Sequence, residues 1–238
     1  MQKVAIMVDG GFFQKRYQSL IQKPLKGKVS AQEVAAFLAR YCQKHAEAND
    51  VADEPMMLYR IFYYDCMPSN KMLYNPLTKA NEDLGKSHQY QWMMDFFKEL
   101  KKLRKVAIRR GVLSDDSIRY GIKLESVNKI IKATTDGIPV NITQSDLVIN
   151  IKQKGVDMRL GLDIASLAYK KQVDKIILIA GDSDFVPAAK LARREGIDFV
   201  LDPLWNNIKD DLFEHIDGMK TCKDLLPRPP RCSTAYHK

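Results

Sequence analysis

The chain has 238 residues, of which 45% are hydrophobic and 28% are charged, and these proportions are typical of a soluble globular protein. The length suits one large domain with an insertion. No apolar run approaches the roughly 18 residues of a membrane helix, and the first apolar run, Val4 to Val8, is too short for a secretory signal. We therefore expect a cytoplasmic protein that does not enter membranes.

The net charge indicates the kind of binding partner, and the cysteine spacing indicates the redox state of the thiols. Lysine and arginine outnumber aspartate and glutamate by 38 to 29, a net charge of +9 that favours a polyanionic partner. The four cysteines have no C-x-x-C spacing, so reduced structural thiols are the expected state. Nothing in the sequence excludes a homo-oligomer.

The first predicted element is a short buried strand over residues 3–8. Asp9, Gly10 and Gly11 follow it directly and predict a loop that places a carboxylate at the strand end. Phe12 and Phe13 come next, and core packing is favoured over base stacking for both rings.

A helix and a second strand follow. The pattern Ser30-Ala-Gln-Glu33 is a capping box and predicts a helix from there to about His45. Residues 58–64 are rich in aromatic and β-favouring residues and predict a buried strand. Asp65 follows that strand, and Tyr63, Tyr64 and Asp65 either border the site or cap the strand end.

The central part of the chain is harder to interpret. Residues 66–105 predict an irregular insertion that contains a helix over 90–103, and residues 106–113 predict a strand. Residues 115–139 are a variable segment in which 124–131 fits a helix or a strand equally well, and 140–151 predict an extended stretch.

A basic run crosses the insertion and the strand after it. Between Lys98 and Arg110 there are seven basic residues and one acid, Glu99. A solvated helix face and a nucleic-acid surface are equally good interpretations. The residues of this run that we assign to substrate binding are Lys101, Lys102, Lys105, Arg109 and Arg110.

The stretch from Lys154 to Pro187 organises the rest. Leu160, Ile164, Leu167 and Ala168 recur at the spacing of one buried helix face, with Asp157 on that face and Asp163 to one side.

Residues 176–180 then predict a parallel strand that is buried on both sides. Asp182 and Asp184 follow its end, and a helix over 185–195 is capped by Ser183 or Asp184. Such strand ends are where open α/β sheets bind ligands.

Two further elements and a tail complete the chain. Residues 197–201 predict a strand and residues 207–219 a helix. We expect one domain over 1–220, with the insertion around 66–105 and the variable segment around 115–139. Residues 221–238 predict a flexible basic tail that contains prolines.

A parallel sheet can bring Asp9, Asp157, Asp182 and Asp184 to one edge. Four carboxylates at close range would repel one another, and a divalent cation relieves that repulsion. Oxygen ligands suit Mg²⁺ or Mn²⁺. The reaction class best supported by these residues is metal-assisted hydrolysis of a phosphodiester.

The sequence resembles the NYN domains of the LabA-like group, which are relatives of PIN-domain ribonucleases. The resemblance is carried by Val4-Ala-Ile-Met-Val-Asp-Gly10, Tyr63-Tyr-Asp65, Lys154-Gly-Val-Asp157 with Asp163, and Ile179-Ala-Gly-Asp-Ser-Asp-Phe-Val-Pro187. It implies a PIN-like three-layer α/β/α sandwich with a central, mostly parallel sheet and an inserted segment. It also implies an acidic metal site at Asp9, Asp157, Asp182 and Asp184. Many members have an asparagine shortly after the first aspartate, which is missing here.

These observations together predict a ribonuclease that acts on single-stranded RNA. Asp9, Asp182 and Asp184 are the expected direct ligands, Asp157 is a ligand or orients a water, and Asp163 and Ser183 support them. Phe12, Tyr63, Tyr64 and Asp65 are the substrate-binding candidates near the site. The alternative is a non-catalytic module that binds RNA or docks a protein through its basic surface.

Overall fold

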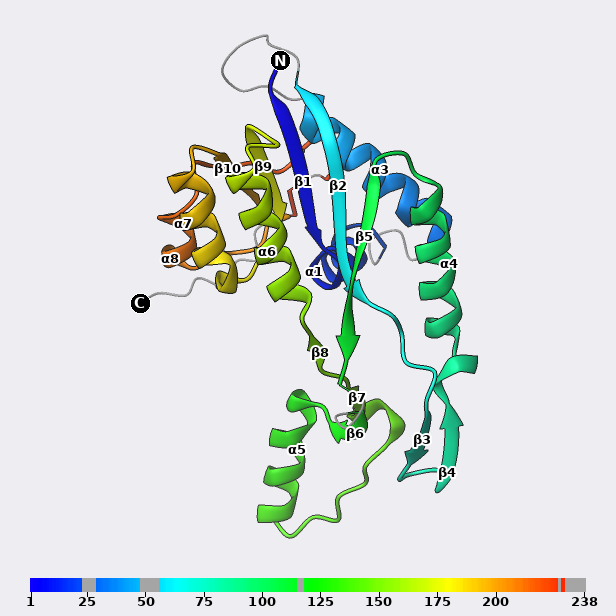
Figure 1. The fold of residues 1–238 in the computed structure, drawn as a ribbon. Helices are drawn as coiled ribbons and strands as arrows, with labels where there is room; N and C mark the ends of the chain where they lie inside the picture. The colour runs from blue at the N-terminus through cyan, green and yellow to red at the C-terminus, as the bar shows by residue number, and fades with distance from the viewer. Residues whose placement is uncertain (23–28, 48–55, 115–117, 227, 230–238) are drawn as a thin grey trace. The chain divides into compact units, whose positions relative to one another are not determined.

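The fold is described from a computed structural model, in which residues 1–22, 29–47, 56–114, 118–226 and 228–229 are described. The chain divides into two units (Figure 1). Unit 1 contains residues 1–65, 95–111 and 155–238, and unit 2 contains residues 66–94 and 112–154. The two units are treated separately below.

Unit 1 is built on a mostly parallel sheet in the order β11-β10-β9-β1-β2-β5. The pairs β1/β2, β1/β9, β9/β10 and β10/β11 are all parallel. The strands are β1 (Lys3–Asp9), β2 (Met57–Cys66), β5 (Val106–Leu113), β9 (Lys175–Ile179), β10 (Asp198–Asp202) and β11 (Gly218–Met219). The chain runs from β1 to β2 on one side and reaches β9 on the other, so β1 and β9 flank the point where the strand order reverses, and ligands bind at such points.

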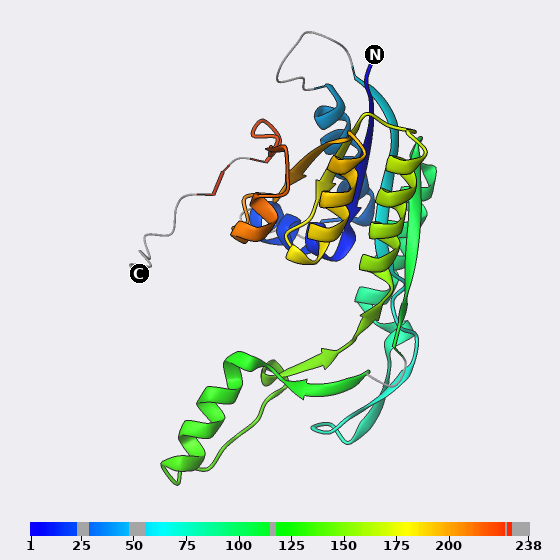
Figure 2. The same ribbon diagram turned by 60° about the vertical axis from the view of Figure 1, so that its left-hand side comes forward.

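Helices cover both faces of this sheet, which gives the three layers expected of a PIN-like α/β/α sandwich (Figures 1 and 2). One face carries α6 (Val156–Tyr169) and α7 (Val186–Arg194), which pack against each other. The other carries α3 (Ala31–Glu47) and the later part of α4 (His88–Lys102). The remaining helical segments are α1 (Gly10–Tyr17), the π-helix η1 (Gln18–Gln22), the 3-10 turn η5 (Ser183–Phe185) and α8 (Asp210–Phe213).

The predictions that rest on patterns within a single helix or strand are confirmed in three places. Every residue from Val4 to Val8 is fully buried, as a parallel strand covered on both faces requires. Leu160, Ile164, Leu167 and Ala168 form the buried face of α6. The capping box is also present, because the Ser30 amide and hydroxyl both donate to Glu33, each at 2.7 Å.

Four predictions in unit 1 need correction. The predicted loop after Asp9 is the helix α1. The predicted helix over 207–219 is only α8, followed by β11. Residues 95–111, partly assigned to the insertion, belong to unit 1, where they supply the end of α4 and most of β5.

The fourth correction concerns the tail. Residues 221–226 pack onto unit 1 with Cys222 and Leu226 buried, and the Leu226 carbonyl accepts a hydrogen bond from Trp205 Nε1 at 2.8 Å. The prediction of a flexible tail rests on its prolines and charged residues. It does not take account of Cys222 and Leu226, the two apolar side chains that pack onto the unit. Residues 227 and 230–238 lie outside the described residues.

Unit 2 gathers both segments that were predicted as insertion and variable region. Its strands pair antiparallel as β3 (Met72–Asn75) with β4 (Ala80–Asp83), β6 (Arg119–Ile122) with β7 (Leu147–Asn150), and the end of β5 with β8 (Gln153–Lys154). Its helices are η2 (Leu84–Lys86), α5 (Leu124–Thr135) and η4 (Gln144–Asp146). Asn75 donates to Gln144 at 3.2 Å and Tyr120 to Glu82 at 2.6 Å, so the two segments are joined by polar contacts. The ambiguous residues 124–131 are thus helical.

Among the described helices, none is both long and apolar enough to cross a membrane. Cys42 and Cys222 are buried free thiols, Cys66 is also buried, and Cys232 lies outside the described residues. The prediction of reduced structural thiols is confirmed for Cys42 and Cys222.

Candidate functional site

Asp9 lies at the carboxyl end of β1 and caps the helix that follows it. Its carboxylate accepts a hydrogen bond from the Phe12 amide at 3.1 Å, which holds one oxygen against the start of α1. The chain turns from strand to helix without a loop because Gly10 has no side chain. A Cβ there would lie 2.5 Å from the Tyr63 ring and 2.7 Å from the Tyr64 carbonyl.

Asp157 lies in the first turn of α6 with its side chain exposed. Gly155 precedes the helix in the left-handed conformation, with φ of 77°, which an L side chain adopts at a cost. This glycine directs the chain into α6 so that Asp157 sits at the positive end of the helix dipole, a location that favours an ionised carboxylate.

Asp182 and Asp184 lie in the turn after β9. The Asp182 carboxylate accepts from the Asp184 amide at 3.2 Å and so caps η5; the predicted cap, Ser183 or Asp184, is one or two residues too late. Both carboxylates are exposed. Gly181 lies directly against the Phe12 ring, since a Cβ there would overlap it, and this contact joins the strand ends of β1 and β9.

Electrostatics tie the four carboxylates together. Burial raises the pKa of Asp9, the Phe12 hydrogen bond lowers it, and the charge of Asp157 raises it again. Partial desolvation raises the pKa of Asp157, and the charges of Asp182 and Asp184 raise it further. Asp157 therefore interacts electrostatically with Asp9, Asp182 and Asp184, and this is the repulsion expected where several acids share one site.

The donor set fits a hard divalent cation in its chemistry. All four side chains offer carboxylate oxygens, and three of them are exposed. In the part of the chain that the structure describes, no three His, Cys, Asp or Glu side chains lie close enough together to hold a metal ion.

The remaining predicted acids have protein partners. Asp163 accepts from Tyr64 Oη at 2.8 Å and from Arg109 Nε at 2.8 Å. Asp65 is buried and accepts from Gln14 Nε2 at 3.2 Å.

The prediction that Tyr63 and Tyr64 stack on RNA bases is contradicted, because both side chains are fully buried. Tyr63 packs against Phe96 and Phe97 of α4, while the hydroxyl of Tyr64 reaches Asp163 on α6. Adjacent strand residues point to opposite faces, so the two rings serve as parts of two different layers.

The basic run from Lys98 to Arg110 does not form one surface. Arg109 lies over Phe62, with its guanidinium carbon 5.2 Å from the ring centre, and pairs with Asp163 of α6. Arg110 instead lies over Phe97 of α4 at 5.9 Å. Of the three lysines, Lys101 is exposed, Lys102 pairs with Glu99 at 2.6 Å, and Lys105 donates to the Leu58 carbonyl.

Sequence patterns missed several residues near the site. Lys209 Nζ lies 3.2 Å from Ser183 Oγ and brings a cation to the Asp182–Asp184 turn. Leu204 and Trp205, just after β10, both have positive φ, an unusual conformation that often accompanies functional sites. No spacing rule marks these residues, because their proximity depends on how strand ends assemble.

A pocket lies in unit 1 away from the four carboxylates. It has a volume of about 530 Å³ and is lined by Ala39, Leu58 and Leu103. Leu58 is near the start of β2, whereas the carboxylates lie at the strand ends, so this pocket is not part of the candidate site.

The chain is similar to one solved structure and to one protein family. A crystallised protein of unknown function from Vibrio parahaemolyticus is similar at 12% identity, with 94% of this chain and 95% of that chain covered and a TM-score of 0.47. No curated protein matches the chain. The NYN domain family matches residues 75–214, a range that includes Asp157, Asp182 and Asp184. Because that match spans more than half of the 238 residues, the chain belongs to the NYN domain family, whose members are generally ribonuclease-like.

Proposed function

We propose that this protein is an Mg²⁺- or Mn²⁺-dependent ribonuclease that hydrolyses phosphodiester bonds of single-stranded RNA through Asp9, Asp157, Asp182 and Asp184. The observation that carries the proposal is the placement of Asp9, Asp182 and Asp184 after β1 and β9, at the reversal point of the parallel sheet, with Asp157 at the start of α6 near enough to repel them. A protein tolerates uncompensated repulsion of this kind where a ligand relieves it.

The chain's own residues hold the reacting groups. Asp9 and Asp182 are fixed by their capping hydrogen bonds, while Asp157 and Asp184 are exposed beside them. When bound, a divalent cation supplies a Lewis acid for the scissile phosphate and acidifies a water that becomes the nucleophile. Lys209, held near Ser183, places a positive charge where a substrate phosphate approaches the turn.

Finer assignments follow from the same residues. We place the chain in the LabA-like group because Lys154-Gly-Val-Asp157 and Gly181-Asp-Ser-Asp-Phe185 occur together. The buried free thiols of Cys42 and Cys222 favour a reducing compartment, and we infer the cytoplasm. Phe12 is the aromatic candidate that keeps partial exposure at the site, so we assign base contact to it rather than to Tyr63 or Tyr64.

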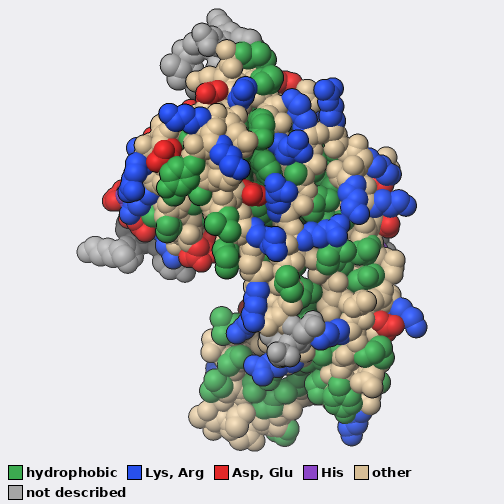
Figure 3. Space-filling view, in the orientation of Figure 1, with side chains coloured by type: hydrophobic (Ala, Val, Ile, Leu, Met, Phe, Trp, Pro, Cys, Tyr) green, Lys and Arg blue, Asp and Glu red, His purple; other side chains and the backbone are tan. Residues whose placement is uncertain are grey.

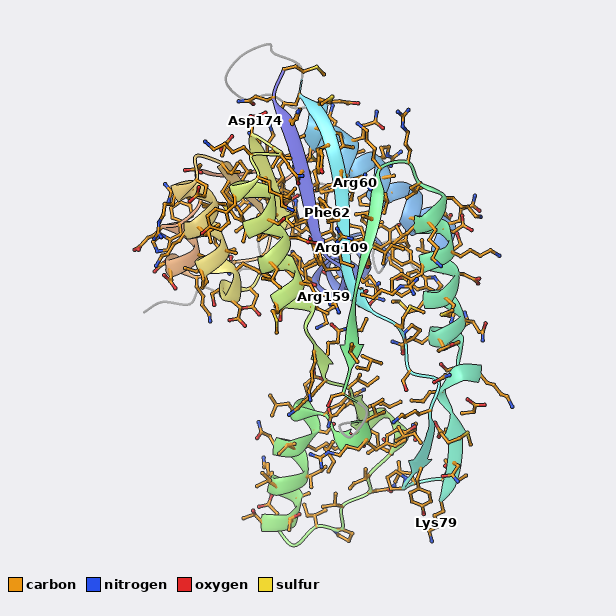
Figure 4. All side chains as sticks on the ribbon, in the orientation of Figure 1. Arg60, Phe62, Lys79, Arg109, Arg159 and Asp174 are labelled. Atoms are coloured by element: carbon orange, nitrogen blue, oxygen red, sulfur yellow. The ribbon has the colours of Figure 1, made fainter. Side chains whose placement is uncertain are left out.

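The decisive experiment compares two identical substitutions on either side of β9. Asp182→Asn removes a ligand after the strand, whereas Asp174→Asn alters an exposed acid just before it (Figure 4). We expect Asp182→Asn to lower Mn²⁺-dependent cleavage of single-stranded RNA about a hundredfold, the scale for losing one preorganised electrostatic group. Asp174→Asn should retain parental activity, and equal activity in both variants would remove Asp182 from the mechanism.

The alternative function is a module that binds RNA without cleaving it, favoured by the basic side chains that gather on one face of unit 1 (Figure 3). A ligand that binds only the folded state raises thermal stability, so Mn²⁺ should raise the melting temperature of the parent but not of Asp182→Asn. This shift together with cleavage supports the ribonuclease. The shift without cleavage of any RNA supports the binding module.

A further inference from the structure

A groove in unit 1 lies beside α6, over strands β2 and β5. Tyr59, Arg60 and Phe62 line it from β2, Arg109 from β5, and Asp163 and Ser166 from α6. Its volume of about 240 Å³ is below the roughly 300–1,000 Å³ typical of small-molecule pockets. The groove therefore suits contact with part of an extended ligand better than enclosure of a small one.

A bulge in β2 builds this groove. Val4 pairs with Leu58 but Ala5 pairs with Arg60, so Tyr59 is an extra residue. In a regular strand Tyr59 and Arg60 would point to opposite faces, whereas here both line the groove. The bulge thus adds Tyr59 to the α6 face of the sheet, on which the exposed Arg60 lies by regular alternation with Phe62.

Arg109 is held in place by two groups, the Asp163 carboxylate and the Phe62 ring. Its Nε donates to Asp163 at 2.8 Å, its guanidinium lies over the Phe62 ring, and Asp163 is held in turn by Tyr64. The Arg109 side chain still has 42% of its surface exposed. A guanidinium oriented in this way keeps unused N–H donors for a ligand, and its fork geometry matches phosphate.

Arg159 extends the positive charge toward the candidate active site. It is exposed and precedes Asp163 by four residues, so the two side chains lie on the same side of α6. Arg159 is also near the helix N-terminus, where the dipole disfavours a cation. Arg60, Arg109 and Arg159 follow one another along the face of unit 1, with Arg159 nearest the end of α6 that carries Asp157 (Figure 4).

The charge of this surface favours an anion. Three arginines face one acid, Asp163, and that acid is paired with Arg109. No ion pair of Arg60 or Arg159 occurs among the residues that the structure describes. Figure 3 shows the corresponding basic side chains over β2, β5 and α6.

We propose that the groove between α6 and strands β2 and β5 binds the phosphate backbone of the RNA strand on one side of the scissile bond, through Arg60, Arg109 and Arg159. This inference rests on the proposed function. From Asp157 to Ser166 the helix rises about 14 Å, so a ligand must be several nucleotides long to contact both the carboxylates and the groove. Arginine contacts to phosphate carry no base information, so binding here is independent of sequence.

The test measures binding in an Asp182→Asn background, where cleavage does not interfere. The probes are labelled uridine and mixed-sequence oligonucleotides of 20 and of 3 residues, with fluorescence anisotropy as the readout across a salt series. Arg60→Gln and Arg159→Gln are made singly and together, and Arg194→Gln on α7 is the matched control because it is exposed and outside the groove.

Each phosphate contact to a single strand contributes about −0.7 to the slope of log K against log salt. The double variant should therefore flatten the slope for the 20-residue probes by about 1.4, equally for both sequences. The 3-residue probes should lose less affinity, and Arg194→Gln should retain the parental slope. Thermal unfolding of each variant verifies that the fold is intact.

The outcomes separate the two proposals. If the parent cleaves RNA and binds the long probes but the double variant keeps the parental slope, the groove assignment is overturned and the ribonuclease stands. If the parent neither cleaves nor binds, both proposals are overturned. A slope change of similar size in Arg194→Gln would show general charge loss and would also overturn the groove.

Discussion

Asp202 and Asp182 both lie at the carboxyl ends of neighbouring parallel strands, Asp202 as the last residue of β10 and Asp182 in the turn after β9, yet their surroundings differ completely. Asp202, at the end of β10, is fully buried and accepts from Tyr41 Oη at 2.6 Å, Thr221 Oγ1 at 2.7 Å and the Leu204 amide at 2.9 Å. His45 Nε2 lies 2.7 Å from the same carboxylate. Asp182, after β9, is exposed and accepts from the Asp184 amide at 3.2 Å.

The difference teaches that a strand-end position does not by itself make an acid functional. A buried carboxylate is stable only when donors satisfy its oxygens, and Asp202 has donors from α3 and from the segment after β11. Its lone pairs are committed to the fold. Asp182 keeps carboxylate oxygens available for a ligand. Its negative charge repels that of Asp157 and helps to raise the pKa of Asp157.

The largest expected effect comes from breaking the Asp202 network. Asp202→Ala leaves Tyr41, Thr221 and Leu204 without an acceptor in a buried place, so we expect the free energy of unfolding to fall by about 3–5 kcal/mol. Urea unfolding followed by Trp205 fluorescence measures this in a Trp92→Phe background, since Trp205 is the tryptophan of unit 1.

Asp182→Ala is the matched control for that measurement. In metal-free protein it removes a charge from a repulsive set but also the cap of η5, so the free energy of unfolding should fall by no more than about 2 kcal/mol, less than for Asp202→Ala. Equal losses in the two variants would mean that Asp182 is structural, and the comparison would fail.

Local patterns predicted the elements well and the partners poorly. The apolar runs at β1 and β9 and the Ser30–Glu33 capping box lie within a few residues of sequence, so their period and spacing were sufficient. The donors of Asp202 come from residues such as Tyr41, 161 positions away, and no local rule distinguishes it from Asp182.

The sequence predicts the positions of the acids better than those of the basic side chains. Strand ends converge in any parallel sheet, and the structure places Asp9, Asp182 and Asp184 at such ends, whereas the sequence patterns do not single out Arg60 and Arg159. Tyr59 reaches the groove through a bulge in β2, and a single extra residue in a strand leaves no signal in a hydrophobic pattern.

An intermediate effect is expected at the two glycines after Asp9, another strand-end acid. Gly10→Ala pushes a methyl group into the Tyr63 ring and the Tyr64 carbonyl, and such overpacking costs about 1–3 kcal/mol. Gly11→Ala meets only the Asp9 carboxylate at 3.6 Å and should gain up to about 1 kcal/mol, because alanine favours a helix over glycine.

Urea unfolding measures both glycine variants. A lower free energy of unfolding in Gly10→Ala together with a higher one in Gly11→Ala would show that close packing at Gly10 holds Asp9 at its strand end. A loss of similar size in both would mean that the turn, rather than the Tyr63 contact, requires glycine.

The smallest effect concerns Asp146 in unit 2, a carboxylate that protein donors satisfy as they do Asp202. It accepts from the Thr143 amide at 2.9 Å, from Thr143 Oγ1 at 2.7 Å and from Ser126 Oγ at 2.9 Å. These hydrogen bonds lower the pKa of Asp146 to about 2, the Thr143 amide contributing most. Burial and mutual charge instead raise the pKa of Asp157, so the direction of the shift distinguishes the two kinds of acid.

A lowered pKa in the folded state makes a pH-dependent contribution to stability. The ionised Asp146 stabilises unit 2 fully above the pKa of an unfolded aspartate, about 3.9, and this contribution is lost as the pH falls toward 2. Asp146→Asn should therefore lower the urea midpoint at pH 7 and approach the parent at pH 3. Trp92 fluorescence in a Trp205→Phe background follows unit 2. Asp136→Asn is the control, because no side-chain hydrogen bond of Asp136 occurs in the described structure. A difference between Asp146→Asn and the parent that stays constant from pH 7 to pH 3 would contradict the assignment, since an amide that merely packs poorly destabilises equally at every pH.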